Sequence, residues 1–159
     1  MEKVKKIFVD TNILLHYKLF VEIDWCSVLN DKYIRLYLTS TNLQELDNFK
    51  YDQNKKRKER ARKVIKHIYE LDELEITTFK VRKNVILEII TTEPPTEIFS
   101  KNNLDPHIQD DRILAAIISC KENENAEFLI LTDDINLRLK AKKFGIGVIN
   151  LPEELALTD

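Results

Sequence analysis

Short apolar runs alternate with amphipathic stretches along this chain. Runs of β-prone residues predict strands at 5–9, 35–39, 128–131 and 148–149. Apolar positions at helical spacing predict helices at 13–30, 43–49, 61–74, 110–118 and 137–141. Strands of this kind, each followed by a helix, favour a three-layer α/β/α fold around a central, mainly parallel sheet.

Two segments give weaker signals. Residues 81–90 contain a β-prone run that fits either a strand or an irregular segment. Residues 91–106 are rich in Pro, Asn and Asp, which predicts a long loop, and we expect a loop of this length to border a functional site. Because the chain has 159 residues and neither repeats nor a linker, we expect one domain over residues 1–159.

Composition excludes several classes of protein. Hydrophobic residues make up 43% and charged residues 33%, which predicts an ordered, soluble chain. No apolar run is long enough to cross a bilayer, and residues 1–6 lead into a strand instead of a signal-peptide core. We therefore expect a cytoplasmic protein with no membrane partner. Two distant cysteines and three dispersed histidines supply neither a disulfide framework nor a zinc motif.

Charge is distributed unevenly along the chain. Between Lys50 and Lys66, nine Lys or Arg residues stand against two acids, a local charge of +7, so the remaining residues carry −9 of the total of −2. A basic strip on an acidic protein suits a polyanion, because neutralising phosphates releases counterions. An amphipathic helix with a basic, solvated outer face is the alternative explanation.

Acidic residues stand at the ends of the predicted strands. Asp10 and Asp134 follow two of them, Glu45 lies one turn into the helix after a third, and the pair Asp110–Asp111 opens another helix. Each alone could be a cap, a turn residue or a solvated side chain. Parallel strands present their carboxyl ends along one edge, so these carboxylates can converge. Such a cluster needs a cation, and hard oxygen ligands suit Mg²⁺ or Mn²⁺.

Four segments carry a resemblance to a known family. Residues 9–15, 42–50, 110–116 and 131–137 resemble, in order, the four acidic motifs of the PIN-domain nucleases. The resemblance implies a metal-dependent ribonuclease of the PIN-like fold. Its main metal-binding and catalytic acids would be Asp10, Glu45, Asp111 and Asp134. Asp110 and Asp133 are secondary candidates within their doublets, and Asn12 and Thr132 are candidate polar supports.

The resemblance also indicates partners. It implies an RNA substrate, and in toxin-type members an inhibitory, antitoxin-like protein; a homodimer and an RNA-processing role are left open. For the RNA backbone, the candidate residues are Lys55, Lys56, Arg57, Lys58, Arg60, Arg62 and Lys63.

Other functional classes fit the sequence less well. With only Gly145 and Gly147, the chain lacks a glycine-rich phosphate loop, which excludes P-loop and dinucleotide-binding proteins. A phosphotransfer domain with Asp10 as nucleophile leaves Glu45 and the basic segment unexplained. A non-catalytic RNA- or partner-binding module is one alternative. A structure-specific DNA nuclease is another, although the chain shows no arch or clamp for threading DNA.

Overall fold

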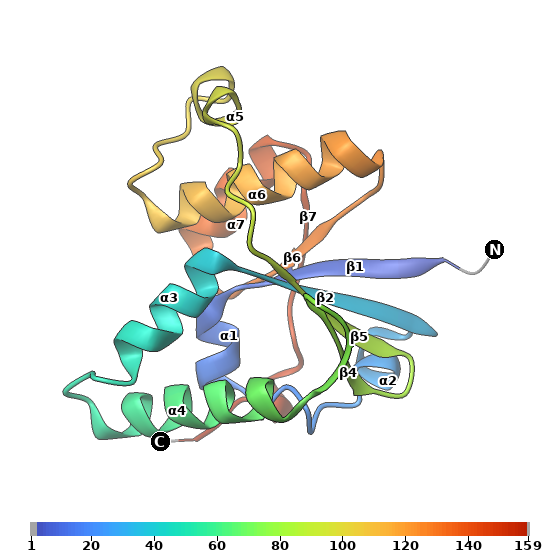
Figure 1. Ribbon diagram of the computed structural model, residues 1–159, viewed down its shortest axis with the longest axis vertical. Coiled ribbons are helices and arrows are strands. Elements are labelled where there is room, and N and C mark those ends of the chain that lie inside the picture. The colour runs from blue at the N-terminus through green and yellow to red at the C-terminus, as the bar shows by residue number, and fades with distance from the viewer. Residues whose placement is uncertain (1–2, 159) are drawn as a thin grey trace.

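A mainly parallel β-sheet forms the middle layer of this computed structural model, which describes residues 3–158 (Figure 1). Among these residues the strands are β1 (Val4–Val9), β2 (Tyr33–Thr39), β3 (Asp72–Glu75), β4 (Thr78–Arg82), β5 (Val85–Ile90), β6 (Leu129–Leu131) and β7 (Gly147–Ile149). They form one sheet in the order β3-β4-β5-β2-β1-β6-β7. The last five in this order pair in parallel, whereas β3 and β4 add antiparallel pairings at one edge.

Helices cover both faces of the sheet (Figure 1). One face carries α1 (Thr11–His16), α2 (Trp25–Leu29), α3 (Ser40–Phe49) and α4 (Lys55–Glu70), and the other carries α6 (Gln109–Glu124) and α7 (Ile135–Lys143). The short α5 (Thr96–Lys101) packs on α6, and the 3-10 helix η1 (Glu153–Leu155) follows β7. This arrangement confirms the predicted three-layer α/β/α fold. No helix within residues 3–158 is long and apolar enough to span a membrane.

The central strand β1 is buried on both faces. Ile7 and Val9 point into the core beneath α1, α3 and α4, whereas Phe8 points into the core beneath α6 and α7. Phe8 stacks there on Tyr37, with ring centroids 5.0 Å apart. Successive side chains of a strand point to opposite faces, so burial on both sides explains the unbroken apolar run in the sequence.

The order of the strands reverses next to β1. The chain passes from β1 to β2 on one side, and β6 later pairs with β1 on the other. Asp10 directly follows β1, and its backbone amide donates to the carbonyl of Leu131, the last residue of β6, at 3.0 Å. Ligands of open α/β sheets bind beyond the carboxyl ends of strands at such a reversal. The fold therefore places Asp10 where a site is expected.

The prediction of one helix over residues 13–30 was wrong, because α1 ends at His16 and α2 begins at Trp25. The segment between them is a buried turn in which Phe20 is only 3% exposed. The carbonyl of Phe20 accepts a hydrogen bond from the Trp25 indole at 2.8 Å, and Asp24 caps α2 by accepting from the amide of Ser27. The apolar residues in this stretch have helical spacing because they are buried in a loop, and not because they form one face of a helix.

The segment between α4 and β5 also differs from the prediction. The long helix ends at Glu70 instead of near Leu74, and the hairpin of β3 and β4 follows it. All four residues of β3 are exposed, and its three acids protect this sheet edge from pairing with other chains. Residues 85–90 form β5, which decides the ambiguous signal of 81–90 in favour of a strand. The predicted loop 91–106 contains α5.

Candidate active site

Asp10 lies at the centre of the candidate site and is 5% exposed. It stands at the N-cap position of α1, yet its carboxylate makes no capping hydrogen bond. The hydroxyl of Thr132, a fully buried residue, donates to Asp10 Oδ2 at 2.8 Å. The same hydroxyl accepts from the backbone amide of Asp134 at 3.0 Å. The nearby backbone amides of Thr11 and Asn12 also lower the pKa of Asp10, but the Thr132 hydroxyl lowers it more and holds the carboxylate toward the carboxyl edge of the sheet.

A chain of hydrogen bonds orients Glu45. The Thr11 hydroxyl donates to Glu45 Oε1 at 3.1 Å, and the Asn42 side-chain amide donates to that hydroxyl at 2.8 Å. Asn42 also donates to the carbonyl of Val9, and its oxygen accepts from the amide and hydroxyl of Thr39. Asn42 is 1% exposed. Through Asn42, the ends of β1 and β2 fix the position of the Glu45 carboxylate on α3.

The two acids that open α6 have different surroundings. Asp111 is 5% exposed, and its Oδ1 accepts from Lys140 Nζ at 2.8 Å. Its Oδ2 accepts from the backbone amide of Asp105 at 2.9 Å, so the end of the predicted loop 91–106 does contact the site. Asp110 is half-buried and lies in the field of Asp134 and Asp10. Asp111 is thus already paired with a cation, whereas Asp110 faces other acids.

The acids after β6 are also divided. Asp134 is exposed and caps α7, its Oδ1 accepting from the amide of Leu137 at 2.8 Å. Asp133 is also exposed and accepts a hydrogen bond from the Tyr17 hydroxyl at 2.6 Å. That bond and burial raise the pKa of Tyr17 to about 12. Asn12 is exposed next to Asp10, at the start of α1.

The electrostatics couple four of these carboxylates. Burial raises the pKa of Glu45 to about 7, and the charges of Asp10 and Asp110 add to this rise. Burial also raises the pKa of Asp10; the Thr132 hydrogen bond opposes that rise, and the charge of Asp134 adds to it. For Asp110 burial is again the main cause, followed by Asp134 and Asp10. The site concentrates negative charge that its own hydrogen bonds do not offset.

We next asked whether these residues fit a metal ion. Within residues 3–158, no three His, Cys, Asp or Glu side chains are placed so that they could hold one together. The chemistry of the donors nevertheless fits Mg²⁺ or Mn²⁺, because the site offers carboxylate and hydroxyl oxygens alone. The raised pKa values point the same way, since a divalent cation would offset the repulsion between Asp10, Glu45 and Asp110.

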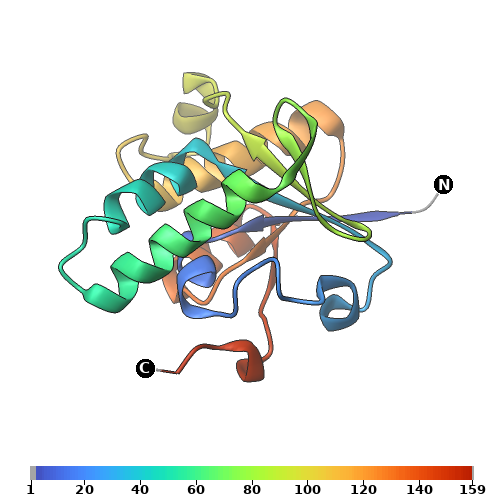
Figure 2. The ribbon, with the colours of Figure 1, turned by 60° about the horizontal axis from the view of Figure 1, so that its bottom comes forward.

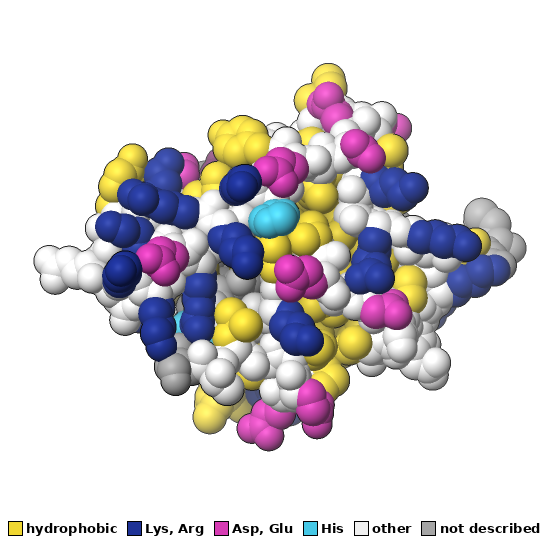
Figure 3. Space-filling view, turned by 90° about the horizontal axis from the view of Figure 1, so that it is seen from below, with side chains coloured by type: hydrophobic (Ala, Val, Ile, Leu, Met, Phe, Trp, Pro, Cys, Tyr) yellow, Lys and Arg dark blue, Asp and Glu magenta, His cyan; other side chains and the backbone are white. Residues whose placement is uncertain are grey.

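The predicted basic residues lie on α4. Asn54 caps this helix, and Ala61 and Val64 face the core. Lys and Arg side chains gather over its amino-terminal half, at the left of the view in Figure 3. Arg57 pairs with Asp52 at 3.1 Å and lies over the ring of Phe49. The helix is therefore amphipathic with a basic outer side. This geometry fits both a surface that binds a polyanion and an ordinary solvated helix face.

Four polar residues at the site were not identified from the sequence: Thr11, Asn42, Tyr17 and Lys140. Asn42 stands one turn before Glu45, a spacing that could have indicated a supporting role. Nothing in the sequence shows that Lys140 reaches back from α7 to Asp111, or that Tyr17 reaches Asp133. These contacts depend on how α6, α7 and α1 are arranged at the sheet edge.

Comparisons with known proteins agree with this fold. A family model described as PIN domain matches residues 7–151. A domain of a functionally unknown protein from Methanocaldococcus jannaschii superposes with a TM-score of 0.52 at 21% identity, covering 98% of this chain and 96% of that chain. VapBC2 from Rickettsia felis, solved bound to a DNA fragment from its promoter, has a TM-score of 0.52 at 17% identity, covering 94% and 100%. No curated protein gave a match.

Proposed function

Because this chain belongs to the PIN domain family, we propose that it is a divalent-metal-dependent endoribonuclease that hydrolyses RNA phosphodiester bonds. PIN domains are generally nucleases. The observation that carries the proposal is the group of repelling carboxylates Asp10, Glu45 and Asp110 at the point where the strand order reverses. Repulsion between these carboxylates destabilises the fold, and a bound cation would offset that repulsion.

Asp10, Glu45 and Asp134 would hold the ion together with one acid of the α6 doublet. The family resemblance assigns this place to Asp111. The contacts favour Asp110 instead, because Lys140 and the amide of Asp105 already occupy the two oxygens of Asp111. Asp133 is the weaker candidate of its own pair, because one of its oxygens already accepts a hydrogen bond from Tyr17.

A bound Mg²⁺ or Mn²⁺ supplies positive charge for the scissile phosphate and lowers the pKa of water. The protein contributes orientation. The Thr132 hydroxyl fixes the rotamer of Asp10, and Thr11 fixes that of Glu45. We assign to the exposed Asn12 a contact with substrate phosphate. No protein nucleophile is needed for hydrolysis of this kind.

The basic outer side of α4 is our candidate for holding the RNA backbone. We place the activity in the cytoplasm. An inhibitory, antitoxin-like protein is a further proposed partner, since the fold is shared with VapBC2.

The proposal is tested by cleavage of end-labelled single-stranded RNA and matched DNA in Mg²⁺, Mn²⁺ or EDTA. We expect metal-dependent cutting of RNA by the wild type. Asp10→Asn should lower the rate on the order of 100-fold or more, because even groups that only support a metal ligand contribute about 10–100-fold. Its thermal unfolding should stay cooperative, since the change removes repulsion and little packing.

Two single variants, Asp110→Asn and Asp111→Asn, decide which member of the doublet belongs to the site, because only that one should match Asp10→Asn. Cutting of DNA but not RNA would replace the proposal by a DNA nuclease. Cutting of neither strand by a folded wild type would replace it by a non-catalytic binding module.

A further inference from the structure

A groove of about 440 Å³ lies beside the candidate active site, between α1, α4 and the carboxyl-terminal segment. Leu14 and Val64 form part of its apolar floor. The carboxyl-terminal segment is tied to the end of α1 by a hydrogen bond from the amide of Lys18 to the carbonyl of Leu155 at 2.8 Å. Figure 2 shows this segment running below α1 to the carboxyl end. The groove is thus a built feature of the fold.

The walls of the groove are positively charged. Among residues 3–158, the cations that line it are Lys18, Lys56, Arg60 and Lys63, and the acids are Glu22 and Glu59. Three of the cations come from α4, and Lys18 comes from the opposite wall after α1. Side chains of one sign on both walls of a concave surface focus the potential and favour an anion that runs between them.

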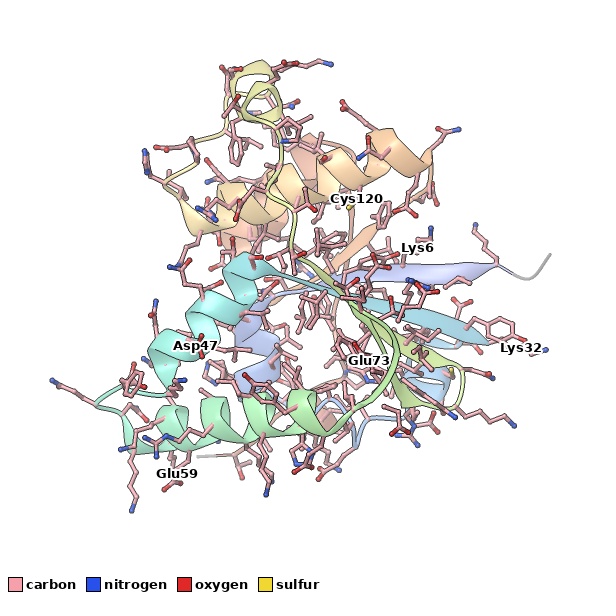
Figure 4. The ribbon with its side chains drawn as sticks, viewed as in Figure 1. Lys6, Lys32, Asp47, Glu59, Glu73 and Cys120 are labelled. Carbon is pink, nitrogen blue, oxygen red and sulfur yellow. The ribbon has the colours of Figure 1, made fainter. Side chains whose placement is uncertain are left out.

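The basic residues of α4 fall on two stripes. Lys56, Arg60 and Lys63 follow helical spacing and line the groove, together with Glu59, which projects below α4 in the view of Figure 4. Lys55, Lys58 and Arg62 lie roughly 100° around the helix and do not line it. The structure therefore separates the basic strip into a groove stripe and an outer stripe.

The groove is connected to the acids. α1 begins at Thr11, beside Asp10, and its six residues extend about 9 Å. At its end Tyr17 lines the groove, and its hydroxyl donates to Asp133 at 2.6 Å. Tyr17 therefore contacts both the groove and an acid that follows β6, and the carboxyl-terminal segment pairs with the chain at this point through a bridge between Tyr17 and Ala156.

We propose that this groove holds the backbone of single-stranded RNA on one side of the scissile bond, with phosphates on Lys18, Lys56, Arg60 and Lys63. This inference rests on the proposed function. It narrows the recognition surface to the groove stripe of α4 and adds Lys18 from the opposite wall. Single-stranded RNA fits better than an acidic peptide, because the groove joins a cationic track to the cluster of carboxylates proposed to cut a phosphodiester.

The test measures binding apart from cleavage. A fluorescein-labelled single-stranded RNA is titrated with protein in EDTA, in an Asp10→Asn background, at several salt concentrations. Lys56→Ala/Lys63→Ala is compared with Lys55→Ala/Arg62→Ala. In both pairs the two residues stand seven positions apart on α4, carry two positive charges and have exposed side chains, so the pairs are matched in charge and helix position.

We expect the groove pair to weaken affinity on the order of 10-fold and to reduce the salt slope by about 1.4, two phosphate contacts for a single strand. Lys55→Ala/Arg62→Ala should change the affinity by less than about 2-fold and leave the salt slope nearly unchanged. Lys18→Ala, on the other wall, should reduce the slope by about 0.7. Thermal unfolding of each variant confirms that it is folded.

Equal losses of RNA affinity for the two pairs of substitutions would overturn the proposal, because the overall positive charge of α4 would then be enough to explain RNA binding. Unchanged RNA binding with lost affinity for an acidic peptide would assign the groove to a protein partner instead. Cleavage by the wild type with equal effects of both pairs would leave the proposed function standing while the groove proposal fails. Groove-specific RNA binding without any cleavage would do the reverse.

Discussion

At the scale of residues, two carboxylates of the candidate site have a threonine hydroxyl beside them. Thr132 donates to Asp10 and Thr11 donates to Glu45, and each bond favours the charged form. For Glu45, burial outweighs this help and raises the pKa to about 7. Without a cation, an ionised Glu45 therefore destabilises the fold at neutral pH.

This leads to a prediction for Glu45→Gln in EDTA. Between its ordinary pKa of 4.5 and about 7, the folded protein binds more protons at Glu45 than the unfolded chain does, so stability falls as pH rises through this window. Glutamine does not titrate. The variant should melt at a higher temperature than the wild type at pH 8, by about 2–4 °C for roughly 1 kcal/mol after solvent screening.

Thermal unfolding at pH 5 and pH 8 checks this expectation. Glu97→Gln, at an exposed position on α5, is the control and should follow the wild type. If Glu45→Gln shows the same fall in melting temperature between the two pH values as the wild type, its carboxyl group is not the one that titrates.

At the scale of elements, Asn42 joins three segments of secondary structure. It lies in the first turn of α3, forms a capping box with Thr39 at the end of β2, and donates to the carbonyl of Val9 in β1. Its side-chain amide also donates to the Thr11 hydroxyl at the start of α1. A single amide thus sets the entry of α3 relative to the strand that carries Asp10.

We expect Asn42→Ala to destabilise the protein by about 2 kcal/mol, because buried partners lose their hydrogen bonds together. Urea unfolding measures this loss. Gln44→Ala, an exposed position on the same helix, should cost less than about 0.5 kcal/mol. A loss for Asn42→Ala as small as that of Gln44→Ala would show that the network contributes nothing to the fold.

Some elements were predictable and others were not, for physical reasons. β1 and β6 are buried on both faces, so their apolar runs stand out in the sequence. The stretch around Phe20 has helical spacing because a loop is buried there, and the spacing alone does not distinguish the two cases. β3 gives no strand signal at all, since Asp72–Glu75 is stabilised by pairing with β4 and not by its own burial.

At the scale of the whole molecule, the fold places like charges together and so should respond to a divalent cation. An ion at 100 times its dissociation constant stabilises a folded protein by about 2.7 kcal/mol, or roughly 5–10 °C for a chain of this size. We expect Mn²⁺ or Mg²⁺ to raise the melting temperature of the wild type by this amount.

Asp10→Asn should lose most of this shift, and NaCl at equal ionic strength should not produce it. Differential scanning calorimetry measures both. An equal shift in the wild type and in Asp10→Asn would place the ion elsewhere on the protein.

The convergence of the acids was predictable from topology, because parallel strands present their carboxyl ends along one edge. In the structure the charges of Asp10, Glu45, Asp110 and Asp134 act on one another, although no three acids within residues 3–158 are placed to hold an ion together. The partner of Asp111 was not predictable. Lys140 reaches it from α7, and the packing of α7 against α6 depends on side-chain volumes that no local pattern encodes.

The hydrogen bond from Thr132 to Asp10 joins residues 122 positions apart. A chain growing on the ribosome at about 5–20 residues per second exposes Asp10 long before β6 exists to pair with β1. Until then the carboxyl edge of the sheet is incomplete, and the acids have no common location. The proposed ribonuclease would therefore be inert toward its own messenger RNA until β6 has emerged and paired with β1.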